Sequence, residues 1–125
     1  MDKAQAIHNF WSSFGLTAFD ENSAYDSQIE LPDKYITYEV QTSNIEGSVA
    51  LTASLWYHST SWEQISKKAD EIAAYIGYGG RVLPLSGKEY MWVKLGSPFS
   101  QRMAVEQDSI RRIVINISVD FLTAT

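Results

Sequence analysis

Apolar residues near the start of the chain recur at the spacing of a helix. Four of them share one helical face: Ile7, Phe10, Trp11 and Phe14. Asp2 stands three residues before Gln5, as in the capping box that begins many helices. The pattern predicts a first helix that begins after Asp2 and ends at Gly15.

A second amphipathic repeat begins beyond residue 60. Its apolar residues follow one helical stripe: Ile65, Ala69, Ile72, Ala73 and Ile76. Thr60 or Ser61 can cap this helix, with Glu63 or Gln64 three residues further on. Because lysines and carboxylates occupy the other side, we expect the apolar stripe to lie against a sheet.

A glycine cluster, Gly77, Gly79 and Gly80, follows this helix and precedes the run RVLPL. Glycine loops that hold phosphate come in the opposite order, after a strand and before a helix, so that the helix N-terminus faces the anion. The lysine and serine of a P-loop do not follow either. We therefore interpret the cluster as the C-terminal cap of the helix.

Alternating and β-branched residues predict strands in the other segments. YITYEV and the alternation from Val49 to Tyr57 predict one hairpin, with QTSNIEGS as its loop. RVLPL and EYMWVKLG predict a second hairpin, in which Pro84 favours an edge or a bulge. The last strand places apolar residues on one face: Ile113, Ile115, Ile117, Val119 and Phe121. Residues 16–34 are expected to be irregular.

Residues 96–109, GSPFSQRMAVEQDS, form a connection longer than the roughly two to six residues common between elements. By length alone this connection is either mobile or used for contact. Phe99 and Met103 then need to be covered, by a partner or by the chain's own domain, and the sequence leaves both alternatives open.

Together these elements predict a single α+β domain over residues 1–125. It has two main helices packed on a mostly antiparallel or mixed sheet of about five strands, in the order α-β-β-α-β-β-β. The chain has no cysteine, and therefore no disulfide framework or thiolate metal site. No stretch approaches the roughly 18 apolar residues of a membrane span, so we expect neither export nor contact with a membrane.

Charge and side-chain chemistry argue against several functions. The formal net charge of −5 disfavours a phosphate-binding face, so we expect no sequence-specific binding of nucleic acid. His8 and His58, the two histidines, lack metal-ligand spacing, and no nucleophile motif surrounds a serine. Arg111 and Arg112 form a small basic cluster of the kind that solvates a strand or pairs with nearby acids. We expect a protein that is not an enzyme and holds no cofactor or metal.

The aromatic load is heavy for a domain of this size. Trp56 and Trp92 fall on the polar faces of their strands, and Trp62 falls in the first turn of the second helix. Exposed aromatic residues often anchor interfaces. Helices on both faces of a curled sheet would cover these residues equally well, so the pattern leaves two interpretations.

Three segments carry a resemblance to a known family: ALTASLWYHSTSWEQISKKADEIAAYIG, MWVKLGSPFSQRM and RRIVINISVDFLT. Their pattern resembles the small tail-completion proteins of long-tailed phages and prophages of Firmicutes, and within that group the tail terminator class. The resemblance extends over nearly the whole chain and lies in the order and pattern of elements rather than in an active-site motif.

The resemblance implies a minor structural protein that assembles with itself into a ring, typically a hexamer, on the end of the tail tube. The ring stops polymerisation of the tail tube protein and presents the surface that joins the head-tail connector proteins. Such a protein acts in the host cytoplasm during virion assembly and then belongs to the virion tail. Its ring needs contacts between two different faces of the subunit.

Loop position and chemistry, rather than a family motif, give five interface candidates: Trp62, Phe99, Arg102, Met103 and Arg111. Two other functions stay open. A head-completion or neck adaptor protein shares the small size and ring assembly but binds on the portal side. A small-ligand-binding module would need polar groups that converge on a cavity.

Overall fold

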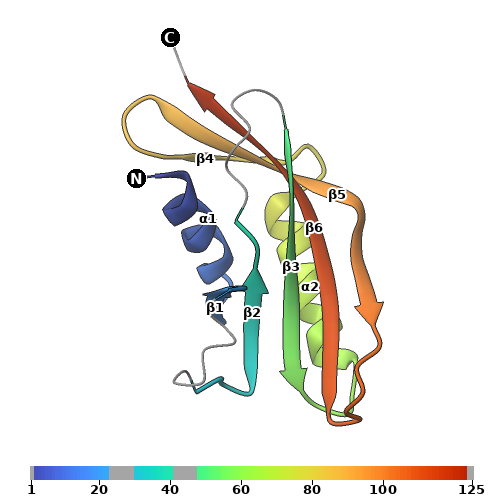
Figure 1. Ribbon diagram of the computed structural model, residues 1–125. Helices are drawn as coiled ribbons and strands as arrows, with labels where there is room; N and C mark the ends of the chain where they lie inside the picture. Colours follow the sequence, from blue (N-terminus) through green and yellow to red (C-terminus); the bar gives the residue numbers. More distant parts are fainter. Residues whose placement is uncertain (1, 23–29, 41–47, 124–125) are drawn as a thin grey trace.

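The computed structural model describes residues 2–22, 30–40 and 48–123, which form two helices and six strands (Figure 1). Along the chain these elements are α1 (Lys3–Ser12), β1 (Thr17–Asp20), β2 (Lys34–Tyr38), β3 (Val49–His58), α2 (Glu63–Ile76), β4 (Arg81–Pro84), β5 (Glu89–Met103) and β6 (Ile110–Thr123). The predicted α+β class with two helices is confirmed. The sequence predicted about five strands, and the described residues form six, with one additional strand before α2.

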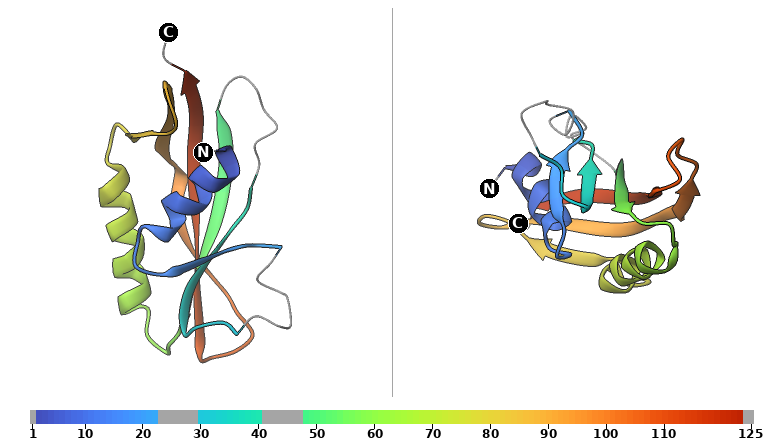
Figure 2. Two further views of the ribbon diagram at one scale, coloured as in Figure 1. Left: turned by 90° about the vertical axis from the view of Figure 1, so that its left-hand side faces the viewer. Right: turned by 90° about the horizontal axis from the view of Figure 1, so that it is seen from below.

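The strands form one mixed sheet in the order β1-β2-β3-β6-β5-β4. β1 runs parallel to β2, and the other neighbouring pairs are antiparallel. The sheet is curled, and both helices pack on one of its faces, as the views in Figure 2 show. The loop predicted between β2 and β3 falls mainly on residues 41–47, outside the described residues.

The strand that the sequence pattern missed, β1, lies in the segment that was expected to be irregular. It has four residues, too few to show an alternation, and it ends in Asp20, a residue type depleted in strands. Tertiary contacts define it instead: Ala18 is buried in the core, and Phe19 packs against the ring of Tyr35 in β2. Residues 23–29 of the same segment lie outside the described residues.

The connection predicted at residues 96–109 is also corrected, because more than half of it is strand. β5 continues to Met103 and pairs with β6 on both sides of an irregularity between Leu95 and Ser100. This bulge shifts the alternation of faces and contains glycine and proline, which is why the pattern indicated a loop. Phe99 is half-buried against the core, so the chain's own domain covers it.

The first helix begins as predicted but ends earlier. The carboxylate oxygen Oδ1 of Asp2 accepts a hydrogen bond of 2.7 Å from the backbone N–H of Gln5. The helix ends at Ser12, and Gly15, with a φ of +79°, belongs to the turn that follows. The capping chemistry was therefore visible in the sequence, whereas the last turn was overestimated.

The second helix has an unusual start and the predicted end. Trp62 occupies its N-cap without a side-chain cap bond, so neither of the predicted capping residues holds that position. Ser61 acts one residue earlier, where its hydroxyl accepts a bond of 3.1 Å from the N–H of Glu63. Gly77 is the C-cap, as predicted, with a φ of +79°.

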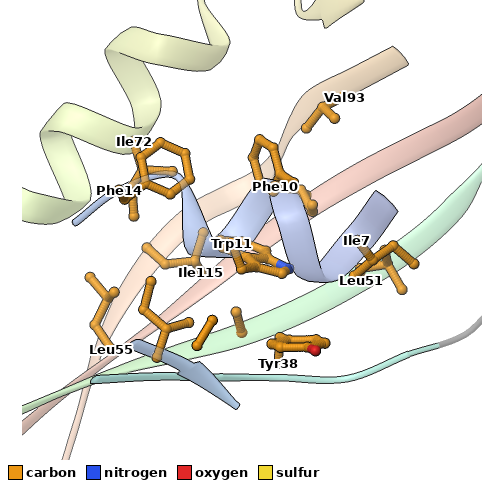
Figure 3. Close-up of a cluster of buried hydrophobic side chains, with 14 of the residues drawn as sticks. Ile7, Phe10, Trp11, Phe14, Tyr38, Leu51, Leu55, Ile72, Val93 and Ile115 are labelled. Carbon is orange, nitrogen blue, oxygen red and sulfur yellow. The ribbon is translucent and has the colours of Figure 1, made fainter. Parts of the chain in front are cut away.

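The core lies between the helices and one face of the sheet (Figure 3). The predicted apolar faces of both helices and of β6 are buried there, except at Ala73 and Phe121, which are half-buried. The largest fully buried side chains come from both helices and from β2, β3, β5 and β6: Trp11, Ile7, Ile36, Leu51, Leu55, Ile65, Ile72, Ile76, Met91, Ile115, Val93 and Val119. Burial of one such aliphatic side chain stabilises the fold by about 1.5–3 kcal/mol relative to exposure.

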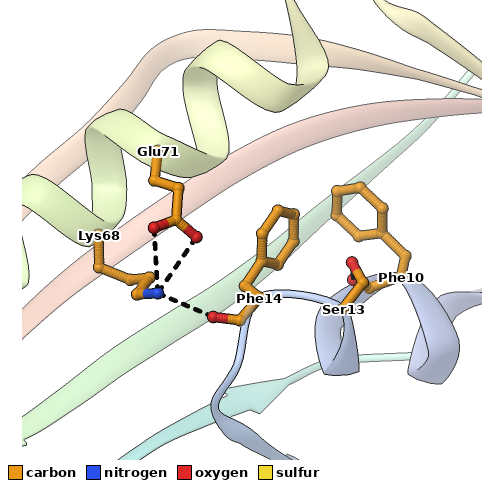
Figure 4. A network of polar contacts seen from close by, with 5 residues as sticks. All are labelled: Phe10, Ser13, Phe14, Lys68 and Glu71. Atoms are coloured by element: carbon orange, nitrogen blue, oxygen red, sulfur yellow. Dashed lines mark hydrogen bonds and ion pairs between the residues drawn. The ribbon is translucent and has the colours of Figure 1, made fainter.

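A polar contact fastens the two helices to each other above this core (Figure 4). Lys68 on α2 donates a hydrogen bond of 2.8 Å to the backbone carbonyl of Phe14, which follows α1. The same ammonium group pairs with Glu71 at 3.1 Å. Because the Lys68 side chain is only 19% exposed, its charge is well placed to satisfy a carbonyl that the helix end leaves open.

Candidate functional site

One face of the sheet points away from both helices, and none of the described helices covers it; we call it the outer face. Its side chains include Phe19, Tyr35, Thr37, Thr52, Ser54, Trp56, Trp92, Lys94, Arg112, Asn116 and Asp120. The alternation along β3 predicted this division, because Thr52, Ser54 and Trp56 fall between core residues. The outer face is therefore the surface on which the sequence placed two of its tryptophans.

An aromatic row crosses the outer face from β1 to β3. Tyr35 stacks on Trp56 with ring centres 6.2 Å apart and planes 12° apart. The ring centres of Phe19 and Tyr35 lie 6.0 Å apart, with planes 78° apart in an edge-to-face contact. The guanidinium of Arg112 lies 4.8 Å from the centre of the Trp56 ring. Trp56 Nε1 donates to the hydroxyl of Thr37 at 2.9 Å. These contacts hold the aromatic row in place with part of its surface open to solvent.

A polar depression of about 180 Å³ lies beside the aromatic row. Glu21 and Glu39 contribute carboxylates to its lining, and Arg112 contributes a guanidinium. Glu39 Oε1 accepts a bond of 2.8 Å from the backbone N–H of Thr52, and Arg112 Nε donates to the hydroxyl of Ser54 at 3.1 Å. Within the described part of the chain, no cation lies within 4.0 Å of either glutamate. The depression carries an excess of one negative charge.

A second polar group on the outer face contains an ion pair whose two charges cancel. Lys94 Nζ pairs with Asp120 Oδ2 at 2.7 Å, and the hydroxyl of Ser48 donates to Asp120 Oδ1 at 2.5 Å. The ammonium group also lies 4.5 Å from the centre of the Trp92 ring. The hydrogen bonds from Lys94 and Ser48 hold the pKa of Asp120 below its ordinary value. This group stabilises the sheet and leaves no free charge for a ligand.

Three of the predicted interface residues meet at the start of α2. The guanidinium carbons of Arg102 and Arg111 lie 4.9 Å and 5.3 Å from the centre of the Trp62 ring. Arg111 also donates to the carbonyl of Thr60 at 2.8 Å and to two further backbone carbonyls nearby. Arg102 is exposed and reaches only the hydroxyl of Ser66, at 3.5 Å. We call Trp62, Arg102 and Arg111 the Arg–Trp–Arg cluster.

The other two predicted residues lie elsewhere. Phe99 sits in the bulge of β5 and faces the core. Met103 pairs with Arg112 across the sheet and is 37% exposed at the edge of the outer face. The structure thus brings Trp62, Arg102 and Arg111 together and places Phe99 and Met103 apart from them. Interface roles for all five residues stay predictions.

The prediction for the two adjacent arginines is wrong in its detail. Arg111 and Arg112 are half-buried, and each rests on a tryptophan, Trp62 in one case and Trp56 in the other. Among the described residues, no carboxylate lies within 4.0 Å of either guanidinium. Sequence reasoning missed the depression because Glu21 lies beside the unrecognised β1. The alternation of β3 and β6, which places Trp56 and Arg112 on one face, gave part of its lining.

Two further searches concern the described residues alone. No group of three or more histidine, aspartate or glutamate side chains among them could hold a metal ion. None of the helices they form is long and apolar enough to cross a membrane. The comparison with protein-family models finds no match, and neither does the comparison with curated proteins.

Proposed function

We propose that this protein is a tail terminator-like structural protein of a phage or prophage, which assembles into a ring on the end of the tail tube. The ring stops the growth of the tube and provides the surface for the head-tail connector proteins. The protein then acts in the host cytoplasm during assembly and remains in the virion tail, without catalysis.

The proposal draws on how the three resembling segments lie in the fold. They correspond to β3 with α2, to β5 as far as Met103, and to β6. The strands β3, β6 and β5 are consecutive neighbours in the sheet, and α2 packs against all three. Segments far apart in the sequence therefore form one continuous unit of helix on sheet.

The single observation that carries ring assembly is that the subunit has two different candidate binding surfaces on opposite faces of the sheet. The outer face offers the aromatic row and an acidic depression, whereas the Arg–Trp–Arg cluster lies at the start of α2 on the other face. A closed ring is built from heterologous contacts, in which one surface of each subunit meets a different surface of its neighbour. Tryptophan, tyrosine and arginine are the residues that most often dominate such contacts.

The test is assembly with the tail tube protein of the same phage or prophage. The mass of the purified protein is measured by light scattering over a concentration series, first alone and then with purified tube protein, whose polymer length is followed by electron microscopy. We expect a ring, or tubes that are shortened and capped at one end. A protein that neither joins nor shortens the tubes contradicts the proposal, and binding to the portal side instead would identify a neck adaptor.

A further inference from the structure

We infer that Arg102 of one copy of this chain inserts into the acidic depression of the next copy, and that this contact joins the subunits head to tail. The inference rests on the proposed ring and names its contact. Its occupant is a second copy of the same chain, bound through charge complementarity between the Arg–Trp–Arg cluster and the outer face.

Arg102 is the member of the cluster that is free to bind. Arg111 donates to three backbone carbonyls and supports the Trp62 ring from one side, so its guanidinium is already engaged. The guanidinium of Arg102 has one long contact with Ser66 and is otherwise open, with Trp62 beside it. An exposed arginine that an aromatic ring holds in place loses less side-chain entropy when it binds than a free one does.

The depression has the charge that one arginine would neutralise. The carboxylates of Glu21 and Glu39 and the guanidinium of Arg112 leave one negative charge in excess. An incoming guanidinium brings this sum to zero and can form two hydrogen bonds with a carboxylate. Arg112 itself is held by Ser54 and Trp56, so it forms a wall of the depression rather than a competing partner.

The geometry excludes a contact within one subunit. Arg102 is paired with Ile113, a buried residue on the helix face of β6, whereas the depression is lined by Ser54 and Arg112 on the outer face. The sheet separates the two surfaces. When one copy docks its Arg102 into a neighbour, its own depression and the neighbour's Arg102 stay open, so the contact repeats instead of closing a dimer.

The test exchanges the two charges. Arg102→Glu and Glu21→Arg are each expected to raise the dissociation constant of self-association by about tenfold or more, because each places like charges at the contact. A mixture of equal amounts of the two variants should associate as the wild type does, since the glutamate introduced in one variant then meets the arginine introduced in the other. Glu21 is the residue to change because it is exposed, whereas Glu39 also holds the backbone of Thr52.

Matched controls carry the same charge changes elsewhere on the surface. Lys88→Glu and Glu106→Arg alter exposed residues outside both surfaces and should leave association unchanged. Circular dichroism and melting temperatures establish that every variant is folded. Sedimentation and light scattering at low and at physiological salt then measure association, with and without tube protein.

The outcomes separate this inference from the proposed function. Wild-type assembly that neither single variant weakens overturns the inference and leaves the ring intact. Loss in both single variants with recovery in the mixture supports the contact, and if tubes are still not capped, it is the terminator function that fails. A wild-type protein that stays monomeric both alone and with tubes overturns both.

Discussion

Replacing Gly80 by alanine tests how tightly the turn after α2 is built against the edge of the sheet. Gly80 has a φ of +86°, a conformation that costs an L-residue about 1–2 kcal/mol. A Cβ atom there would also lie 2.6 Å from Trp92 Nε1 and 2.7 Å from the carbonyl oxygen of Val93. Val93 is fully buried and pairs with Arg81, so relief of the contact has to displace β4 from β5.

Together the two costs predict a large loss of stability. Overpacking of a tight site costs about 1–3 kcal/mol, and together with the backbone term it predicts that Gly80→Ala lowers the free energy of unfolding by roughly 2–5 kcal/mol. Urea denaturation followed by tryptophan fluorescence measures this free energy, and an unchanged slope against denaturant would show that the comparison is sound.

Gly79→Ala is the matched control for this experiment. Gly79 precedes Gly80, does not have a positive φ, and has no atom within 4 Å of the position of a Cβ. Alanine at Gly79 should change the free energy of unfolding by no more than about 0.5 kcal/mol. If the two variants were equally stable, the close approach of Gly80 to β5 would be wrong.

Two further predictions concern single polar side chains. Because hydrogen bonds lower the pKa of Asp120, its carboxylate contributes stability that is complete above its unfolded pKa of about 4 and is lost as the pH falls through the folded value. Asp120→Asn should therefore unfold with a shallower pH dependence between about pH 5 and pH 2 in acid titrations, and an unchanged slope would contradict the assigned bonds. Lys68→Met removes the bond to the Phe14 carbonyl and should cost about 1–2 kcal/mol in thermal denaturation. Lys67→Met, which breaks a solvent-exposed ion pair, should cost less than about 0.5 kcal/mol, and equal losses would refute the difference.

The parts of the fold that could be predicted are those whose burial repeats along the sequence. The stripe from Ile65 to Ile76 and the alternation from Ile113 to Phe121 each indicate one buried face, because the spacing of their apolar residues matches the period of a helix or a strand. The order of the glycine cluster after the helix was likewise enough to identify Gly77 as a cap.

The parts that could not be predicted depend on contacts between distant residues. β1 is too short to show a period and exists because β2 pairs with it. The bulge in β5 breaks the alternation at Gly96 and Pro98, and without the partner strand the interruption looks like a loop.

The candidate site, too, could be predicted from the sequence only in part. Loop position and residue chemistry selected Trp62, Arg102 and Arg111, and the structure brings these three residues together, but no spacing in the sequence indicates that two arginines share one ring. The acidic depression depends on the pairing of β1, β2, β3 and β6, so its glutamates could not be associated before the sheet was known.

The two central strands of the sheet come from opposite halves of the chain. Residues 49–58 of β3 pair with residues 110–119 of β6, and a pairing over such a distance closes a large loop before its contacts repay the lost entropy. Domains of this kind fold on a timescale of roughly milliseconds to seconds. During synthesis, the backbone edge of β3 that pairs with β6 therefore stays without its partner strand until β6 leaves the ribosome. In that interval the strand is exposed to other nascent chains, so the yield of soluble protein depends on how fast translation delivers β6.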